Sequence, residues 1–294
     1  MAFIRTLDIR AIEFFSGLGG WRYAMKGLGT VISAYDISEV ANTAYRLNFG
    51  ESPNTRELAT VSLSEIRALN ADAWLMSPPC QPFCRMGRGK GLMDARSAAF
   101  IHLMDLLIET RPQRLLLENV TGFFESDAFA MLAERLARIG LAWRCFNLCP
   151  TQFGVPNRRP RVFVAASASG VLNNRPPSIE PSPIFNYLDA AEDTDLYLSG
   201  DIIARHGAGL DIVTVESRRS ACFIGGYGKR LVGAGSFLQT ERGIRRFSPG
   251  EISRLLGYPP DFRFPPDLSL NNQYKLLGNG LNLVVAGWAL GQLL

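Results

Sequence analysis

The chain has 294 residues, of which 47% are hydrophobic and 20% charged, so a largely disordered protein is excluded and one large domain, or a large and a small one, can form. The net charge of +4 is too small to identify a partner by itself. The most apolar stretch, residues 281–294, is shorter than the ~20 residues that span a bilayer, which gives no membrane signal.

The first half of the chain alternates strand-like and helix-like stretches. Apolar runs predict strands at residues 11–15, 30–35, 73–76, 114–118, 141–148 and 161–166. Helical spacing predicts helices at residues 20–27, 39–49, 97–109 and 127–139. This alternation is typical of an α/β, Rossmann-like fold whose mostly parallel sheet is covered by helices on both faces.

The second half is organised differently. Four prolines within residues 173–183 indicate a stiff linker, and glycine-rich, loop-heavy sequence follows it. We therefore expect a first domain over residues 1–167, a small domain over 168–243 and a return to the first domain over 244–294. The return begins with a capping box at residues 248–251 before a short helix, and it ends with a helix over 279–294.

A lone cysteine, Cys80, stands between prolines directly after a predicted strand, in the sequence Ser-Pro-Pro-Cys-Gln-Pro-Phe of residues 77–83. The prolines hold Cys80 in a loop that can join neither a helix nor a central strand. Basic residues that would favour the nucleophilic thiolate follow: Arg85, Arg88, Lys90 and Arg96. The pattern predicts a reactive thiol, with a buried structural cysteine as the alternative.

Two Cys-x-x-x-Cys pairs, Cys80 with Cys84 and Cys145 with Cys149, raise the possibility of a metal site. Cys145 and Cys149 lie at opposite ends of a strand-like run, where an i, i+4 pair is about 13 Å apart and too distant for one zinc ion. We therefore expect no metal. Five cysteines without an export signal indicate reduced thiols and a cytoplasmic location.

A glycine turn, Phe-Ser-Gly-Leu-Gly-Gly at residues 15–20, lies between the first predicted strand and helix. Such a turn lets a ligand approach backbone amides, although it also occurs merely to pack a helix closely. Asp36 ends the next strand, where an acid can accept both ribose hydroxyls. Together they indicate an adenosine-bearing cofactor, either NAD or S-adenosylmethionine. The alternative for Asp36 is a helix N-cap, which Ser38 could provide instead.

A second acid, Glu118, follows three leucines at residues 115–117. A carboxylate at the end of an apolar strand is costly unless it is paired or functional. At the carboxyl edge of a parallel sheet, it would face the same crevice as Cys80. Arg159 and Arg161 supply cations that could pair with it, lower the thiol pKa or hold a phosphate; a structural salt bridge is the alternative.

Basic residues are concentrated between residues 202 and 248. This stretch has three acids, Asp211, Glu216 and Glu241. It has eight cations: Arg205, Arg218, Arg219, Lys229, Arg230, Arg242, Arg245 and Arg246. A basic surface suits nucleic acid, and a solvated face of scattered charges is the alternative.

Five short motifs occur in a specific order: the glycine turn at residues 15–20, Pro-Cys-Gln at 79–81, Glu-Asn-Val at 118–120, Arg-x-Arg at 159–161 and Gly-Asn at 278–279. In this order they make nearly the whole chain similar to the cytosine-5 methyltransferases of DNA and RNA. The resemblance implies an S-adenosylmethionine-dependent domain completed by the C-terminal helix. It also implies that the small inserted domain recognises the target.

The resemblance further implies a mechanism. Cys80 adds to C6 of a flipped cytosine, Glu118 stabilises the adduct near N3, and Arg159 and Arg161 position the base. The implied residues for S-adenosyl-L-methionine, and for its product S-adenosyl-L-homocysteine, are Phe15, Leu18, Gly19, Gly20, Asp36, Ile37, Glu57, Leu58, Pro79, Asn279 and Gly280. The implied substrate-binding residues are Gln81, Arg85, Arg96, Asn119, Cys222 and Tyr227.

Residues 222–228, Cys-Phe-Ile-Gly-Gly-Tyr-Gly, resemble the block that marks the subgroup methylating tRNA in the anticodon loop. Ile224 stands where this subgroup usually has threonine, which removes a hydroxyl that could contact substrate or loop backbone. The leading hypothesis is a tRNA cytosine-5 methyltransferase, followed by a DNA cytosine-5 methyltransferase. A nucleic-acid-binding protein with an idle catalytic centre is the third. No membrane and no obligate protein partner are expected.

Overall fold

The computed structural model describes residues 8–79, 97–191 and 193–294, and the chain divides into two compact units. The first comprises Met1–Leu148, Pro160–Arg175 and Ala286–Leu294, and the second comprises Cys149–Arg159 and Pro176–Val285. We expected the chain to return to the first domain at residue 244. In the structure, residues 244–285 pack with the second unit instead. The recognition role of the inserted domain stays a prediction.

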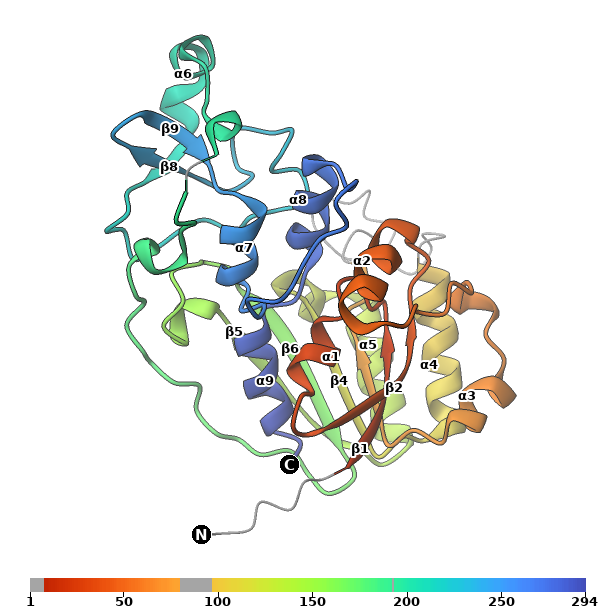
Figure 1. Ribbon diagram of the computed structural model, residues 1–294. Coiled ribbons are helices and arrows are strands. Elements are labelled where there is room, and N and C mark those ends of the chain that lie inside the picture. The colour runs from red at the N-terminus through yellow and green to blue at the C-terminus, as the bar shows by residue number, and fades with distance from the viewer. Residues whose placement is uncertain (1–7, 80–96, 192) are drawn as a thin grey trace. The chain divides into compact units, whose positions relative to one another are not determined.

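A six-stranded sheet forms the centre of the first unit (Figure 1). Its strands, in the spatial order β2-β1-β3-β4-β6-β5, are β1 (Ile9–Phe14), β2 (Gly29–Tyr35), β3 (Ala73–Met76), β4 (Arg114–Val120), β5 (Ala142–Leu148) and β6 (Arg161–Ser167). Strands β2, β1, β3 and β4 pair in parallel, whereas β6 is antiparallel to both β4 and β5. The predicted α/β fold with a mostly parallel sheet is confirmed.

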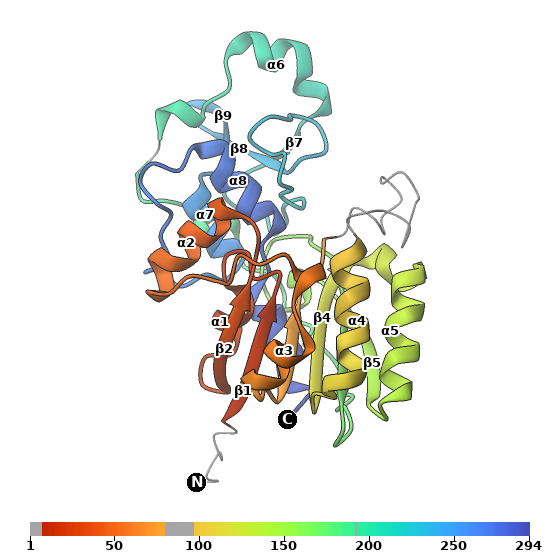
Figure 2. The ribbon, with the colours of Figure 1, turned by 90° about the vertical axis from the view of Figure 1, so that its right-hand side faces the viewer.

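Helices cover the sheet on both faces. They are α1 (Gly20–Ala24), α2 (Glu39–Phe49), α3 (Leu63–Leu69), α4 (Ala98–Thr110) and α5 (Asp127–Arg138). Figure 2 shows α4 and α5 together on one side of the sheet. On that side Ile12, Trp74 and Leu115 belong to the main apolar core, with less than 2% of each side chain exposed. Because strand side chains alternate, the neighbouring Glu13 projects to the other face, where it meets α1.

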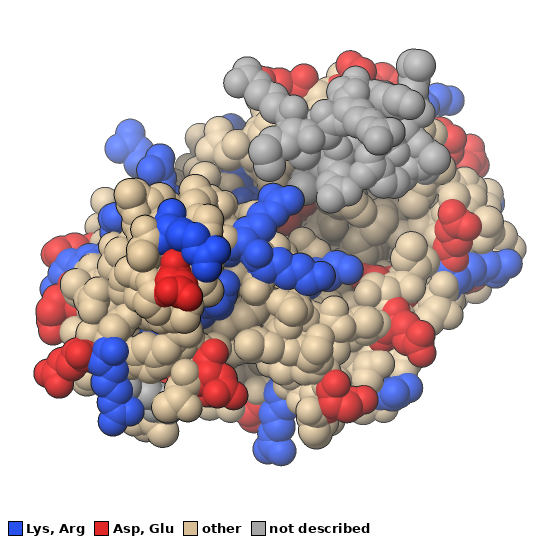
Figure 3. Space-filling model, turned by 90° about the horizontal axis from the view of Figure 1, so that it is seen from above, with Lys and Arg blue, Asp and Glu red and all other residues tan. Residues whose placement is uncertain are grey.

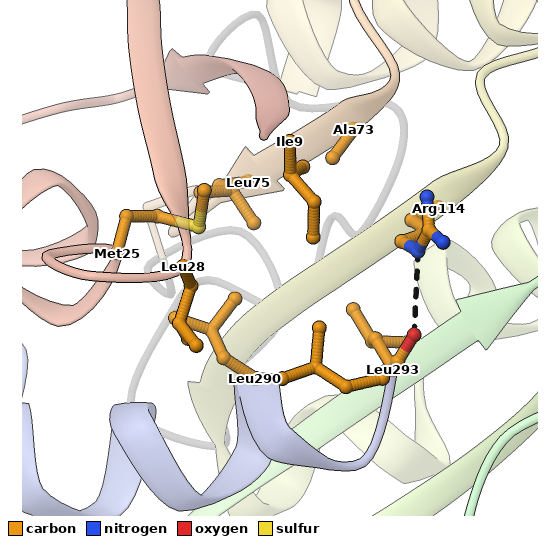
Figure 4. A pocket seen from close by; sticks show the side chains of 9 residues that line it. Ile9, Met25, Leu28, Ala73, Leu75, Arg114, Leu290 and Leu293 are labelled. Atoms are coloured by element: carbon orange, nitrogen blue, oxygen red, sulfur yellow. Dashed lines mark hydrogen bonds between the residues drawn. The ribbon is translucent and has the colours of Figure 1, made fainter. Parts of the chain in front are cut away.

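The C-terminal segment closes the first unit at the amino ends of its strands. Leu290 and Leu293 lie against Ile9 and Leu75 around a cavity of about 10 Å³ (Figure 4). Arg114 Nε donates to the carbonyl of Leu293 at 3.3 Å. A cavity of this size holds at most one water, so it is packing space and not a ligand pocket.

The helix predicted over residues 279–294 is present but begins later, as α9 (Leu283–Gly291), and a separate helix that the sequence did not predict precedes it. Helix α8 (Leu270–Asn279) ends before Gly280, and α9 (Leu283–Gly291) begins after Asn282. The side chain of Asn282 accepts from the backbone N–H of Val285 at 3.1 Å and so caps α9. Among the described residues, no helix is long and apolar enough to cross a membrane.

The second unit contains a small sheet and short helices. Its elements are α6 (Gly200–His206), β7 (Asp211–Val213), β8 (Ser236–Thr240), β9 (Gly243–Arg246) and α7 (Pro249–Leu255), followed by α8. The predicted capping box is present, since Ser248 and Glu251 exchange hydrogen bonds at the start of α7. Glu251 also pairs with Arg245 at 2.7 Å, and both side chains are buried. This ion pair joins α7 to β9 inside the unit.

Candidate active site and cofactor turn

Four of the predicted site segments meet at one edge of the sheet in the first unit. The glycine turn follows β1, Asp36 follows β2, Pro79 follows β3, and Glu118 lies near the end of β4. In parallel strands these carboxyl ends share one edge, which is where open α/β sheets bind ligands. The predicted residues Cys80, Gln81, Arg85 and Arg96 lie outside the described residues.

The glycine turn has a backbone that few side chains tolerate. Phe15, Gly17 and Gly19 have positive φ angles of 58°, 52° and 75°. A Cβ at Gly19 would lie 2.2 Å from a ring carbon of Phe49, so this position excludes any side chain. Phe15 is strained for a non-glycine residue, and strain of this kind is often found at ligand-binding turns.

Asp36 ties the end of β2 to the glycine turn. Its Oδ2 accepts from the N–H of Gly17 and its Oδ1 from the N–H of Ser38, both at 2.8 Å. Burial raises the pKa of Asp36 above its usual range, and the two backbone donors oppose that shift. Ser38 caps α2, accepting from Ala41. Asp36 is therefore not the cap, and each oxygen retains a lone pair beyond the bonds described.

The remaining predicted cofactor residues of the first unit differ in exposure. Ile37, next to Asp36, is 70% exposed and offers an apolar surface, and Glu57 is exposed as well. Leu18 and Leu58 are buried, so their side chains belong to the core. Only the backbone of these two leucines can contribute appreciably to a ligand contact.

Glu13 is a buried acid that the sequence interpretation missed. Its side chain is fully buried, and Oε1 accepts from the N–H of Trp21 at 3.0 Å, at the start of α1. Oε2 accepts from the hydroxyl of Tyr45 at 3.3 Å, which in turn accepts from Arg22. Burial raises the pKa of Glu13 to about 8. The signal was present, since Glu13 interrupts an apolar strand just as Glu118 follows one.

Glu118 forms an ion pair at the end of β4. Arg161 Nε lies 3.1 Å from Glu118 Oε1, and their side chains are 18% and 12% exposed. The register of the antiparallel pair places Glu118 opposite Phe163, two residues along β6 from Arg161. The structural salt bridge considered as an alternative is therefore present, and the carboxylate keeps a small exposed surface at the sheet edge.

Asn119 holds the loop that leads into Cys80. Its Nδ2 donates to the carbonyl of Pro78 at 2.9 Å, and the residue is 2% exposed. Trp21 Nε1 donates to Ser77 Oγ at 3.0 Å. Both contacts fix the described base of the loop, which gives Asn119 a positioning role there.

In the second unit, Arg159 contacts the segment that carries Asn279. Its terminal nitrogens donate to the carbonyls of Gly278 and Gly280, and also to Cys222 Sγ and the Phe223 carbonyl. Asn279 itself is exposed. The predicted substrate residue Tyr227 is completely buried, and its hydroxyl donates to the carbonyl of Ser236. A substrate contact by Tyr227 would require this core to open.

Comparison with known proteins identifies the family. Residues 9–206 match the family described as C-5 cytosine-specific DNA methylase. The chain belongs to this family. It is a cytosine-5 methyltransferase, and the resemblance drawn from the five motifs is confirmed.

Relatives of this cytosine-5 methyltransferase carry two kinds of name. A DNA (cytosine-5)-methyltransferase of Dictyostelium discoideum is 31% identical, with 95% of this chain and 92% of that protein covered. A tRNA (cytosine(38)-C(5))-methyltransferase of Homo sapiens is also 31% identical, over 94% of this chain and 97% of that protein. The structure of the Entamoeba histolytica methyltransferase EhMeth, 29% identical, superimposes with a TM-score of 0.92 over 97% of each chain.

The methyltransferase carries basic residues on the surface of its second unit. The exposed members are Arg205, Arg218, Arg219, Lys229, Arg230 and Arg242. Figure 3 shows one face of the molecule on which Lys and Arg side chains gather. Such a surface is suited to phosphates. Among the described residues, no group of three or more His, Cys, Asp or Glu side chains could hold a metal ion.

Proposed function

We propose that this cytosine-5 methyltransferase modifies a cytosine in the anticodon loop of a tRNA, through a covalent adduct of Cys80. The observation that carries the catalytic part is the Glu118–Arg161 ion pair. It lies beside Asn119, and Asn119 fixes the base of the loop that leads into Cys80. The tRNA part is supported by the name of the human relative and by the Cys-Phe block at residues 222–228.

The proposed chemistry begins with the thiolate of Cys80. It adds to C6 of the cytosine, which makes C5 nucleophilic, while Glu118 in its protonated form donates a hydrogen bond or its proton to ring N3. Arg161 keeps the Glu118 carboxyl in place. After C5 has taken up a methyl group, loss of the C5 proton and departure of the thiolate restore the aromatic ring. The cytosine must leave its stack to reach such a site.

The methyl donor we propose is S-adenosyl-L-methionine, which supplies an electrophilic methyl group when bound. The first unit fits its adenosine part, because Asp36 retains acceptor capacity for ribose hydroxyls and Ile37 exposes an apolar side chain beside it. Only glycine fits at position 19, because its φ is positive and a Cβ would meet the ring of Phe49. No side chain therefore covers the backbone of the turn at this position. A cytoplasmic location, expected from the cysteine usage, is part of the same proposal.

The test is a transfer assay with methyl-labelled S-adenosylmethionine and three polymers: bulk tRNA, genomic DNA without cytosine methylation, and an all-deoxy stem-loop copied from the labelled tRNA. We expect label in tRNA and none in the stem-loop, because RNA recognition depends on loop shape and 2′-hydroxyls. Bisulfite mapping then locates the modified cytosine.

Three outcomes contradict parts of the proposal. Label in DNA and not in tRNA would establish the DNA methyltransferase that the Dictyostelium relative's name suggests. Label in tRNA that persists in a Cys80→Ala variant would eliminate the covalent step, since alanine has no nucleophile. A wild-type protein that binds S-adenosylhomocysteine but labels neither polymer would have an idle catalytic centre.

A further inference from the structure

Arg159 is one of the most deeply buried cations of the second unit, with 3% of the residue exposed. Its Nη2 donates to the carbonyls of Gly280 at 2.7 Å and Gly278 at 3.0 Å. Its Nη1 donates to the Phe223 carbonyl at 3.2 Å and to Cys222 Sγ at 3.4 Å. One planar guanidinium thus joins two segments that are far apart in the sequence, and each bond to a charged donor is stronger than a neutral one.

The two glycine carbonyls lie at the carboxyl end of α8, on either side of Asn279. The last carbonyls of a helix lack partners within the helix and carry the negative end of its dipole, so a cation there is favourable. By holding the carbonyls before and after Asn279, Arg159 fixes the direction in which the exposed Asn279 side chain leaves the turn.

The segment of residues 222–228 packs directly on the same helix. A Cβ at Gly278 would lie 2.1 Å from the backbone nitrogen of Gly225, and a Cβ at Gly228 would lie 2.9 Å from the ring of Tyr274. Glycine at 278 therefore lets two backbones touch, and glycine at 228 leaves room for side chains of α8, which gives the glycine-rich block a packing role. The rings of Tyr227 and Tyr274 meet edge to face at 5.1 Å between centroids and complete the contact.

We infer that Arg159 is a positioning residue that locks the Cys222–Phe223 segment to the Gly278–Gly280 turn and so sets Asn279 for the cofactor. This inference rests on the proposed use of S-adenosylmethionine, and the family resemblance implies a cofactor role for Asn279. It differs from the role that the family resemblance implies for Arg159, which is to hold the target base. Residues 222–228, which resemble the block of the tRNA-methylating subgroup, would then act on cofactor binding through Asn279.

The first test compares Arg159→Lys with Arg158→Lys, the same change at an exposed neighbour. We expect Arg159→Lys to weaken the binding of S-adenosylhomocysteine, titrated by calorimetry without nucleic acid, by about tenfold, or about 1.4 kcal/mol. A lysine has a single ammonium in place of the fork, so it cannot satisfy both carbonyls and the Cys222–Phe223 segment together. Arg158→Lys should stay within about twofold of wild type.

Steady-state kinetics separates the two roles. With saturating tRNA, Arg159→Lys should raise the KM for S-adenosylmethionine and largely keep kcat. If Arg159 instead holds the base, the variant would bind S-adenosylhomocysteine like wild type and lose kcat or raise the KM for tRNA. That result would overturn the inference. A failure of the proposed tRNA activity would leave the calorimetric comparison intact, because it uses no nucleic acid.

A second test needs no substitution of Arg159. Gly278→Ala separates the backbones of residues 225 and 278, whereas at Gly226 an added Cβ meets only the flexible side chain of Arg230 at 3.3 Å. We expect Gly278→Ala to weaken S-adenosylhomocysteine binding and Gly226→Ala to leave it unchanged. In the wild-type protein, the ligand should slow hydrogen exchange in residues 222–226 and 277–282 together. Slowing confined to residues 277–282 would show that the two segments are not locked.

Discussion

The two turns that carry the proposed cofactor residues are held by different kinds of side chain, acidic acceptors in one and a cationic donor in the other. In the first unit, the turn of residues 15–20 leads into the start of α1, and carboxyl groups hold it: Glu13 accepts from Trp21, and Asp36 accepts from Gly17. In the second unit, the turn at Gly278–Gly280 follows the end of α8, and the guanidinium of Arg159 holds it.

The difference follows from the polarity of a helix. Its first turn presents N–H groups that need acceptors, and its last turn presents carbonyls that need donors. The helix dipole adds to both effects, because it favours anions at the amino end and cations at the carboxyl end. A buried side chain of the right sign can therefore fix either kind of turn and leave the outward-facing backbone available to a ligand.

The largest expected effect concerns the charge of Glu13. Its pKa rises from 4.5 to about 8 on folding, so the folded protein keeps a proton that the unfolded chain has lost between these pH values. The contribution of Glu13 to stability is complete below pH 4.5 and declines as the pH rises to about 8. Glu13→Gln keeps an acceptor for Trp21 and cannot ionise. Relative to wild type, it should gain about 3–5 kcal/mol of unfolding free energy from pH 4.5 to 8.

Urea unfolding at several pH values measures this difference. The residues facing the Glu13 carboxyl are Trp21, Tyr45 and Arg22, and the charge of Arg22 and the bonds from Trp21 and Tyr45 oppose the shift that burial causes. Glu109→Gln, on an exposed pair with Arg67, serves as the control and should show no comparable pH trend. Parallel curves for Glu13→Gln and wild type would mean that Glu13 is ionised in the folded protein, and the first turn would then be held by a full charge.

A backbone test of the first turn should have the next largest effect. Gly19→Ala places a Cβ against Phe49 in a left-handed conformation, which should cost about 2–4 kcal/mol of stability and impair cofactor binding. Gly17→Ala has the same unfavourable φ but open space around it, so about 1–2 kcal/mol is expected. Equal costs, measured by urea unfolding, would show that conformation alone and not the contact with Phe49 requires Gly19.

The sequence allowed much of the first turn to be predicted and little of the second. The position of Asp36 after β2 was predicted correctly because it depends on a local order of strand, glycine turn, strand and acid, whereas its cofactor role stays a prediction. Glu13 was missed although it interrupts an apolar strand, because a strand covered on both faces has no polar alternation that would show which way the acid points.

The second turn depends on contacts that no local pattern contains. The carbonyls that Arg159 holds lie 119 and 121 residues away, and its thiol partner lies 63 residues away. Helix α8 was not predicted, and the helix that follows it begins at Leu283 and not at Asn279. Pairings at such separations are set by the tertiary fold.

The smallest expected effect tests whether surface charge helps to hold the first turn. Arg22, in α1, pairs with Glu51, but their side chains are 23% and 61% exposed. Water and salt screen such a pair, so Glu51→Gln should cost less than about 1 kcal/mol and the cost should vanish at high salt. Urea unfolding of Glu51→Gln beside Glu13→Gln, at low and at high salt, measures this. A larger, salt-independent loss would mean that the Arg22–Glu51 pair, and not only the buried carboxylate, fixes the start of α1. The first turn would then be held by a network of charged side chains, whereas the second turn is held by the single buried cation of Arg159.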